Sequence, residues 1–371
     1  MRRVVLVGAS GHGRTYLHEL AAGAAELVGV CDIAPLDDEG RALVGDRPID
    51  ADLPRLLQRT RPDIVIVATP IHTHITMARQ VFDAGADLLL EKPPAPTLDG
   101  WRRLVAYAGG RPCQVGFQSL GSGAFTQLRS LVRDGRLGDL RGIGAWGAWS
   151  RPDGYYRRAR WAGRRVLDGE PVTDGALTNP FAHATATALA LTGDTGEGDI
   201  ASIELELLRA HDIEADDTSC LRLRTARGVR VVVAVTLCAA SEAEPVLIVH
   251  GTRGRAELHY TRDLLVLDGR TQQYGRTTPL AGLLAHLDDS RRPLQSELAT
   301  CGGFMRVLEA VRRAADPVPI PPQFLLVRGA GDERRIDVAG VERAVRDAAE
   351  RLRTFTELGV PWATSTLRRA G

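Results

Sequence analysis

The first 118 residues alternate short apolar runs with segments of helical periodicity. Each helical segment carries apolar residues at steps of three and four, and two of them end at glycines. This alternation is typical of βαβ units, so it predicts a doubly wound parallel sheet. We expect strands at residues 3–8, 26–32, 62–70, 86–93 and 113–118, and helices at 14–22, 74–85 and 98–110.

After residue 118 the pattern changes to loops and helices, and then to strands. Residues 202–208 and 220–224 alternate apolar and charged side chains, and 246–260 read as a hairpin with Gly251 and Gly254 in its turn. These features predict a large, mainly antiparallel open sheet. The predicted architecture is therefore α/β in residues 1–118, followed by an α+β second domain in residues 119–371.

The strand predicted at residues 229–237 has no polar face. Its core, "VVVAV", is apolar at every position, so both of its sides must be covered. We expect helices on one side and a partner subunit on the other. This predicts a homodimer or homotetramer assembled through the second domain.

The chain returns to helical periodicity near its end. In residues 338–359 the apolar positions Val341, Val345, Ala348, Leu352 and Phe355 form one stripe before Gly359. The stripe predicts a helix that faces a core. Packing of this helix back onto the first domain is one option.

Composition narrows the class of protein. The chain has 371 residues, is 44% hydrophobic and carries a net charge of +1, so no overall field favours nucleic acid. It contains no apolar run of about 18 residues that could cross a membrane and no secretory leader at its start. Its five cysteines form no CxxC pair, which favours reduced thiols and no metal site. We expect a cytoplasmic protein.

A glycine-rich turn, "GASGHG", joins the first strand to the first helix. Gly8 and Gly13 occupy the outer places of the dinucleotide fingerprint GxGxxG, whereas its middle place is Ser10 with Gly11 beside it. Asp32 ends the second strand, where a carboxylate accepts hydrogen bonds from the adenosine ribose. The turn residues predicted to bind cofactor are Gly8, Ala9, Ser10, Gly11, His12 and Gly13.

The carboxylate of Asp32 also predicts which dinucleotide binds. It would repel a 2′-phosphate, and the nearest arginine downstream is Arg41, so NAD is favoured over NADP. Two other interpretations remain open at this point: a glycine turn that holds no nucleotide, and an aspartate that only caps its strand.

Lys92 is the only lysine among 47 basic Lys and Arg residues. It follows the apolar run "DLLL" at the carboxyl edge of the predicted sheet, where ligands bind in open α/β folds. Pro93 favours an extended backbone at Lys92 or a cis bond after it. An ammonium is compact and can share in proton transfer, whereas a guanidinium stays charged. We therefore predict that Lys92 acts in catalysis rather than as a surface charge.

Together, "GASGHG", "CD", "ATPIHTH", "AGADLLLEKPPAPT" and "VGFQ" resemble the Gfo/Idh/MocA family, the glucose–fructose oxidoreductases and inositol dehydrogenases. The resemblance extends through "GTRGRAEL" to "FTELGVPWA". It implies a nicotinamide-dependent oxidoreductase acting on sugars, cyclitols or related polyols, with the lysine of the EKP triplet and a histidine of the second domain at the catalytic centre. It also implies cofactor contacts by Thr69, Pro70, His72, His74, Glu91, Lys92 and Gln118.

The resemblance points to His183 as that histidine. The family pattern GxLxDxxxH is held by Gly175, Leu177, Asn179 and His183, with asparagine where the family usually has aspartate. Asn179 cannot take a proton, so it would hold the substrate hydroxyl, orient His183, or serve only as a helix cap before Pro180. Asp174 could supply a carboxylate nearby.

Other candidates are less specific. His72 and His74 either cap the following helix or pack beneath the cofactor. The stretch "YYRRARWAGRR" is either a solvated loop or a clamp for an anionic or polyhydroxylated substrate. In the second case, Trp161 would stack on a sugar ring while Tyr156 and Arg164 bind hydroxyl groups.

The predicted reaction is reversible hydride transfer between nicotinamide and a carbinol carbon of a sugar-like substrate. His183 would be the general base, Lys92 would stabilise the alkoxide, and Asn179 would hold the hydroxyl. Substrate contacts are expected from Lys92, Tyr156, Trp161, Arg164, Asp174, Asn179 and His183. The alternatives are an NAD-dependent glycosidase with transient oxidation and a dinucleotide-binding regulator without turnover.

Overall fold

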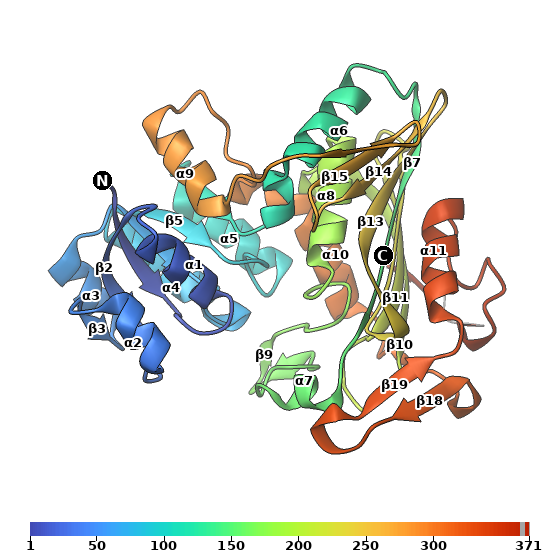
Figure 1. Ribbon diagram of the computed structural model, residues 1–371, viewed down its shortest axis with the longest axis horizontal. Coiled ribbons are helices and arrows are strands. Elements are labelled where there is room, and N and C mark those ends of the chain that lie inside the picture. The colour runs from blue at the N-terminus through green and yellow to red at the C-terminus, as the bar shows by residue number, and fades with distance from the viewer. Residues whose placement is uncertain (364–367, 371) are drawn as a thin grey trace. The chain divides into compact units, whose positions relative to one another are not determined.

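The computed structural model describes residues 1–363 and 368–370, and it divides into two compact units (Figure 1). Unit 1 comprises Met1–Gln118 and Thr277–Thr300, and unit 2 comprises Ser119–Arg276 and Cys301–Gly371. The sequence analysis assigned every residue after 118 to the second domain. Residues 277–300 instead return to unit 1, because helix α9 (Pro279–Asp288) buries Leu280 and Leu283 in that unit's core.

Unit 1 is built on a six-stranded parallel sheet with the order β3-β2-β1-β4-β5-β6. Its central strands are apolar runs with both faces covered, as a parallel sheet between two helix layers requires. The predicted doubly wound fold is confirmed. The strands are β1 (Arg3–Val7), β2 (Glu26–Cys31), β3 (Ile49–Asp50), β4 (Ile64–Val67), β5 (Asp87–Leu90) and β6 (Cys113–Val115).

Three helices of unit 1 begin at a side chain that caps them and end at a residue with positive φ. Thr97 accepts a hydrogen bond from the Gly100 amide at the start of α5, and Gly109 ends that helix with φ 59°. The three predicted helices are present, and α2 and α3 add to them. The helices before α9 are α1 (Gly13–Ala21), α2 (Asp38–Val44), α3 (Leu53–Thr60), α4 (His74–Asp83) and α5 (Leu98–Ala108).

Unit 2 contains a large sheet with the order β16-β15-β14-β13-β7-β12-β11-β10-β17, and β20 also pairs with β10. The β7–β12 and β10–β17 pairs are parallel, and the other pairs are antiparallel. The predicted mainly antiparallel sheet is confirmed. Its strands are β7 (Leu140–Ser150), β10 (Ile200–Arg209), β11 (Thr218–Thr225), β12 (Arg230–Thr236), β13 (Cys238–Gly251), β14 (Arg255–His259), β15 (Leu264–Leu267), β16 (Arg270–Gln273), β17 (Val318–Pro319) and β20 (Arg368–Ala370).

Helices cover both faces of this sheet (Figure 1). On one face lie α6 (Gly123–Arg133), α8 (Ala182–Thr192) and α10 (Gly302–Arg313), and on the other lies α11 (Val341–Arg351). Short elements complete the unit: α7 (Asp153–Arg157), the pair β8 (Val166–Leu167) and β9 (Glu170–Pro171), and the pair β18 (Leu325–Arg328) and β19 (Arg335–Val338). In the described part of the chain, no helix is both long and apolar enough to cross a membrane.

Strand β12 does not need a partner subunit to cover it. Residues 231–235 are fully buried, and α8 contacts the strand from one side while α11 contacts it from the other. The reason given for a homo-oligomer is therefore wrong, because a helix of the same chain covers the second face. Assembly itself stays a prediction.

The C-terminal helix is shorter than its apolar stripe predicted. It ends at Arg351 because Leu352 adopts a left-handed conformation with φ 53°. Beyond it, the amides of Phe355 and Thr356 donate to the buried carboxylate of Glu206 (2.7 and 2.9 Å). These hydrogen bonds take the place of those that a longer helix would make. The apolar stripe of α11 packs on the sheet of unit 2.

Strand β7 was missed by the sequence analysis although it lies inside the large sheet. Glycine weakens strand propensity, and "RGIGAWGAWS" carries three glycines. Two of these glycines are needed because other segments of unit 2 approach the strand closely. A Cβ at Gly144 would overlap the backbone carbonyl of Ala349 in α11, and one at Gly147 would overlap the ring of Phe181. These glycines let α11 and the segment before α8 lie directly on the sheet.

Gly144→Ala should therefore destabilise the fold. The methyl group would push α11 away from β7, and overpacking of this kind costs about 1–3 kcal/mol. Urea unfolding followed by circular dichroism measures the loss as a lower midpoint. Gly198→Ala is the control, because no atom lies within 4 Å of its added Cβ. Equal midpoints for Gly144→Ala and the unaltered protein would contradict this account of β7.

Candidate functional site

The glycine turn of unit 1 is shaped by contacts with its own strand layer. Gly8 has φ 81°, and a Cβ there would lie 2.8 Å from the Ala68 carbonyl oxygen at the end of β4. A Cβ at Gly13 would overlap the carbonyl of Gly8. Gly11 has φ 56°, and no atom lies within 4 Å of its Cβ position. The outer glycines thus allow α1 to cross close to β1 and β4, and the space in front of Gly11 is open.

Asp32 lies at the end of β2 and supports this turn. Its Oδ2 accepts a hydrogen bond from the Ala9 amide (2.9 Å), and its Oδ1 accepts one from the Ala34 amide (2.9 Å). Each carboxylate oxygen has lone pairs left for a further donor. The geometry is compatible both with a structural role and with ribose binding.

Glu91 is a buried carboxylate at the centre of unit 1. Its Oε1 accepts from the Tyr16 hydroxyl of α1 (2.6 Å) and lies 3.4 Å from His12 Nε2 in the glycine turn. Its Oε2 accepts from the Lys92 amide (3.1 Å). Burial, together with the charge of Glu91, raises the pKa of Tyr16. Glu91 therefore links the glycine turn and α1 to the backbone of Lys92.

Gly116 faces the same carboxylate. A Cβ at this position would overlap Glu91 Oε1, so the strand end after β6 must carry a glycine to leave room for the acid. Gly116 belongs to the motif "VGFQ" quoted for the family resemblance, but nothing in that motif predicts this contact, because Gly116 has no unusual backbone angle.

Lys92 is half-buried and lies two residues after the end of β5, and its bond to Pro93 is cis. His74 braces the backbone beside it. His74 Nδ1 lies 2.8 Å from the Pro93 carbonyl, and its Nε2 lies 2.8 Å from the Thr69 carbonyl. Burial lowers the pKa of this imidazole, which is 1% exposed. His74 is therefore not the cap of α4, whose N-cap is Thr73, and its packing beneath the cofactor stays a prediction.

The turn after β4 carries the neighbouring candidates. Thr69 Oγ1 lies 2.6 Å from Thr73 Oγ1, and Thr73 donates to the Pro70 carbonyl (2.7 Å). His72 is exposed in the short 3₁₀ turn Ile71–Thr73. The turn is therefore held by its own hydroxyl groups, and His72 extends away from the buried core. Gln118 is half-buried at the last position of unit 1.

In unit 2, His183 is half-buried and is the second residue of α8. The cap of this helix is Phe181, whose side chain makes no capping bond. The interpretation of Asn179 as the helix cap is therefore wrong. Asn179 lies earlier, where its amide donates to the Gly175 carbonyl (3.0 Å). Lys92 and His183 belong to different units, so each is described within its own.

Asp174 and Asn179 form a pair. Asn179 Nδ2 donates to Asp174 Oδ1 at 2.5 Å, and Asp174 Oδ2 accepts from the Gly163 amide at 2.8 Å. The carboxylate missing from position 179 is thus present one hydrogen bond away. The geometry fits the suggestion that Asp174 supplies a carboxylate near position 179.

Two hydroxyl groups near His183 were missed by the sequence analysis. Ser119 Oγ lies 3.4 Å from His183 Nδ1, and Thr187 donates to Ser119 Oγ at 2.8 Å. Both residues are buried. Thr187 lies four positions after His183 on the same helix, and that spacing was the one available signal. Ser119 carries no comparable pattern.

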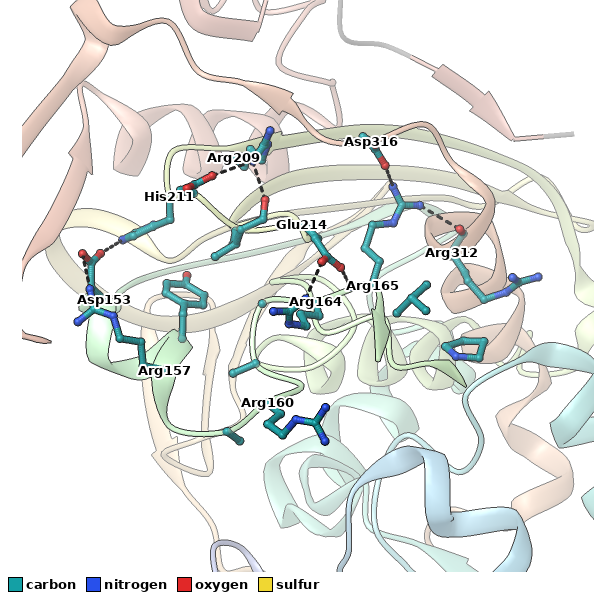
Figure 2. Close-up of a pocket in the computed structure, with 18 of the residues that line it drawn as sticks. Asp153, Arg157, Arg160, Arg164, Arg165, Arg209, His211, Glu214, Arg312 and Asp316 are labelled. Carbon is teal, nitrogen blue, oxygen red and sulfur yellow. Dashed lines mark hydrogen bonds and ion pairs between the residues drawn. The ribbon is translucent and has the colours of Figure 1, made fainter. Parts of the chain in front are cut away.

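The arginine-rich stretch lines a pocket of about 1520 Å³ within unit 2 (Figure 2). Several of the arginines drawn there pair with an acid or a backbone carbonyl that is also drawn, whereas Arg160 and Arg312 pair with acids outside the pocket lining. Arg164 pairs with Glu214 (3.0 Å), whereas Arg165 donates to the carbonyls of Val311, Arg312 and Ala314 at the end of α10. Arg165 therefore closes a helix terminus, while Arg164 remains half-exposed at the pocket wall.

Tyr156 and Trp161 do not have the surroundings that were expected. Burial raises the pKa of Tyr156, whose hydroxyl is enclosed and has no hydrogen-bond partner. The guanidinium of Arg158 lies 4.8 Å above the Trp161 ring and covers one of its faces. Arg164 is therefore the best exposed of the three proposed substrate contacts.

A buried cluster of His211, Asp217 and Cys238 lies behind this pocket. Its donor atoms lie within 4.8 Å of one another, a spacing that could hold a metal ion. Asp217 Oδ2, however, already accepts from the amides of Ala210 (2.9 Å) and His211 (2.8 Å), and it lies 3.0 Å from His211 Nδ1. These hydrogen bonds account for the arrangement without an ion.

Comparison with known proteins was made for both units. Residues 2–119 match the model of the oxidoreductase family with an NAD-binding Rossmann fold, and residues 125–257 match the GFO/IDH/MocA C-terminal domain. Inositol 2-dehydrogenase 1 of Saccharopolyspora erythraea is 32% identical over 148 residues, which are 37% of this chain and 43% of that protein. Inositol 2-dehydrogenase 2 of Paenarthrobacter aurescens is 29% identical over 143 residues, 35% of this chain and 42% of that protein. The match thus spans less than half the length of these relatives.

Solved structures share the fold over more of the chain. The WlbA dehydrogenase of Bordetella pertussis, in complex with NADH and UDP-GlcNAcA, has a TM-score of 0.70 and 22% identity, covering 84% of this chain and 95% of that one. The UDP-N-acetylglucosamine 3-dehydrogenase GnnA of Acidithiobacillus ferrooxidans has a TM-score of 0.66 and 18% identity, covering 84% and 96%. Both family models match this chain in order, and the first describes an NAD-binding domain. The chain therefore belongs to the Gfo/Idh/MocA family of oxidoreductases.

Proposed function

We propose that this protein is an NAD-dependent dehydrogenase that transfers a hydride between nicotinamide and a secondary alcohol or ketone of a sugar, cyclitol or sugar derivative. One observation carries the proposal. The only lysine of the chain lies two residues after the end of β5, and the Glu91 carboxylate that binds its amide also accepts from Tyr16 in the helix behind the glycine turn. Lys92 is therefore fixed relative to the cofactor turn within one unit.

The residues of unit 1 fit NAD. The open space before Gly11 and the N-terminus of α1 suit a pyrophosphate. Asp32 would accept hydrogen bonds from the adenosine ribose, and Thr69 and Pro70 would border the nicotinamide side. When bound, the nicotinamide would accept or supply the hydride. Glu91 and His74 would act from beneath the cofactor, by holding the backbone on either side of Lys92.

The ammonium of Lys92 would stabilise negative charge that develops on the substrate oxygen, and it would share in moving the proton. His183 would be the base that receives this proton during oxidation. Asn179 would hold the substrate hydroxyl through its amide. Asp174, which accepts a hydrogen bond from that amide, would orient it and bring negative charge near the site.

The substrate class is supported by the relatives and by the chemistry of the site. Inositol 2-dehydrogenases and a UDP-sugar complex are among the similar proteins. The pocket of unit 2 is lined mainly by charged and small side chains, which suits a polyhydroxylated ligand better than an apolar one. Arg164 would contact hydroxyl or anionic groups. A screen of polyols, sugars, sugar acids, nucleotide sugars and glycosides, read by NADH absorbance, identifies the substrate.

Two other functions are distinguished by the fate of the cofactor. A glycosidase with transient oxidation would retain NAD through purification and release products without net NADH. A regulator would bind NAD without turnover of any substrate. Accumulation of NADH in proportion to oxidised substrate supports the dehydrogenase and contradicts both alternatives.

The expected homodimer or homotetramer and the cytoplasmic location also stay proposals. The mass of the protein in solution, measured by light scattering after gel filtration, tests the first of them. A monomer at micromolar concentration would contradict it.

Lys92→Arg and His183→Ala should each lower kcat by about 100- to 10,000-fold, the usual contribution of positioned proton transfer. The guanidinium keeps the charge at position 92 but cannot share its proton, and alanine removes the base. Stopped-flow absorbance of NADH measures the rate, and calorimetric titration should show nearly unchanged NAD binding.

The control for these variants is His18→Ala, because His18 is a half-exposed histidine of α1 that pairs with Glu39 on the surface. It should retain the full rate. Full activity in both Lys92→Arg and His183→Ala would refute the assignment of the catalytic residues.

Asp32→Ala should change the preference between the two dinucleotides. The variant loses a charged hydrogen bond to the ribose, which weakens NAD binding, and it no longer repels a 2′-phosphate, which strengthens NADP binding. The dissociation constant for NADP divided by that for NAD should therefore fall by about 10-fold or more. The ratio is the decisive quantity, because a disturbed glycine turn would weaken both cofactors alike. Asp38→Ala, at an exposed position of α2, is the control. An unchanged ratio would leave Asp32 as a structural residue only.

A further inference from the structure

Two buried hydroxyl groups lie beside the imidazole proposed as the base. Ser119, which is 1% exposed, is the first residue of unit 2, and its Oγ lies 3.4 Å from His183 Nδ1. On another side the His183 ring lies 6.4 Å, centroid to centroid, from the buried ring of Tyr260. Nδ1 therefore faces a hydroxyl group, and in the proposed reaction Nε2 would be the nitrogen that meets the substrate.

Thr187 fixes the position of that serine. Its Oγ1 lies 2.8 Å from Ser119 Oγ and 2.6 Å from the carbonyl oxygen of His183, one helical turn back along α8. Thr187 is fully buried and β-branched, so its side chain has few alternative rotamers. The Ser119 hydroxyl is thus held between the imidazole and a rigid residue of the same helix.

This arrangement bears on the protonation of the ring. A neutral imidazole carries one proton, and it can act as a base at Nε2 only when that proton is on Nδ1. Ser119 Oγ is within reach to accept the Nδ1–H bond, both in the neutral ring and in the imidazolium that forms after proton transfer. A distance of 3.4 Å is long, but such bonds often tighten once the substrate is bound.

We propose that Ser119 and Thr187 are positioning residues for His183: Ser119 accepts the Nδ1–H bond and Thr187 holds Ser119 in place, so that Nε2 carries the lone pair. This inference rests on the proposed function, because it assigns a supporting role to residues around the proposed base. It also gives the reaction a neutral hydroxyl partner for the histidine in a chain that has asparagine, not aspartate, at position 179.

The test compares three variants of buried hydroxyl residues. Ser119→Ala and Thr187→Val should each lower kcat by about 3- to 30-fold with KM nearly unchanged, since each removes one hydrogen bond that orients the base. Thr185→Val is the matched control. Thr185 is also fully buried on α8, but its hydroxyl has no hydrogen-bond partner, so its loss should leave kcat unchanged. Thr187→Ser should restore most of the rate.

A second measurement reports on the ring itself. In the ¹⁵N-histidine spectrum above pH 8, the His183 signals are those absent from His183→Ala. They should show the Nδ1–H tautomer in the unaltered protein and in Thr185→Val, and a mixture of tautomers in Ser119→Ala. If Thr187→Val does not fold, Ser119→Ala carries the test, because Ser119 lies on a different element from α8.

The outcomes separate the two proposals. If the unaltered protein forms no NADH from any of the screened substrates, the proposed function fails. If His183→Ala retains the full rate, His183 is not the base, and the inference about its positioning fails with that assignment. If His183→Ala is inactive while Ser119→Ala and Thr187→Val keep both the normal rate and the normal tautomer, only the inference about positioning fails. Equal losses in Thr185→Val and Thr187→Val would assign the effect to helix packing and would also overturn it.

Discussion

The hydrogen bond from Tyr16 to the buried carboxylate of Glu91 is the interaction on which the arrangement of unit 1 depends. A buried carboxylate is costly unless donors satisfy it, and here a tyrosine, a backbone amide and a nearby imidazole surround it. These donors come from α1, from the residue after β5 and from the glycine turn. One acid therefore fixes the distance between the cofactor turn and Lys92. Gly116 is part of the same constraint, because only a residue without Cβ leaves room for the acid.

Unit 2 also contains a buried carboxylate held by hydrogen-bond donors, that of Asp174. The family pattern has an acid at position 179, and this chain has an amide there with an acid five residues earlier. The negative charge is retained in the unit, but it bonds Asn179 and the Gly163 amide. His183 Nδ1 has a hydroxyl group in reach. Under the proposed function, this neutral hydroxyl group would orient the imidazole without sharing a negative charge with it.

Much of the fold could be predicted from the sequence because the relevant forces act locally. Apolar runs such as "IVIV" of β4 pack on both faces, and their pattern reports that burial directly. Strand β7 could not be predicted in this way. Its glycines serve the close approach of α11 and Phe181, which come from distant parts of the chain. The end of α11 was missed for the same reason, because Glu206 lies about 150 residues before the amides that it binds.

The candidate site likewise contains residues whose positions follow from local patterns and residues whose contacts come from distant parts of the chain. The positions of Asp32 and Lys92 near strand ends could be predicted because strand ends have fixed places in a doubly wound sheet, whereas no spacing in the sequence encodes the contacts of Ser119 and Gly116.

The arginines of residues 157–165 show how little a charge pattern alone decides. In the folded chain Arg165 closes α10, and the guanidinium of Arg158 lies over two aromatic rings. Arg160 and Arg164 pair with exposed acids, and such pairs contribute little to stability because water screens them. For the same reason they exchange partners at little cost. The most exposed arginines are therefore the ones available to a ligand, and the buried Arg165 keeps the loop that carries them in place.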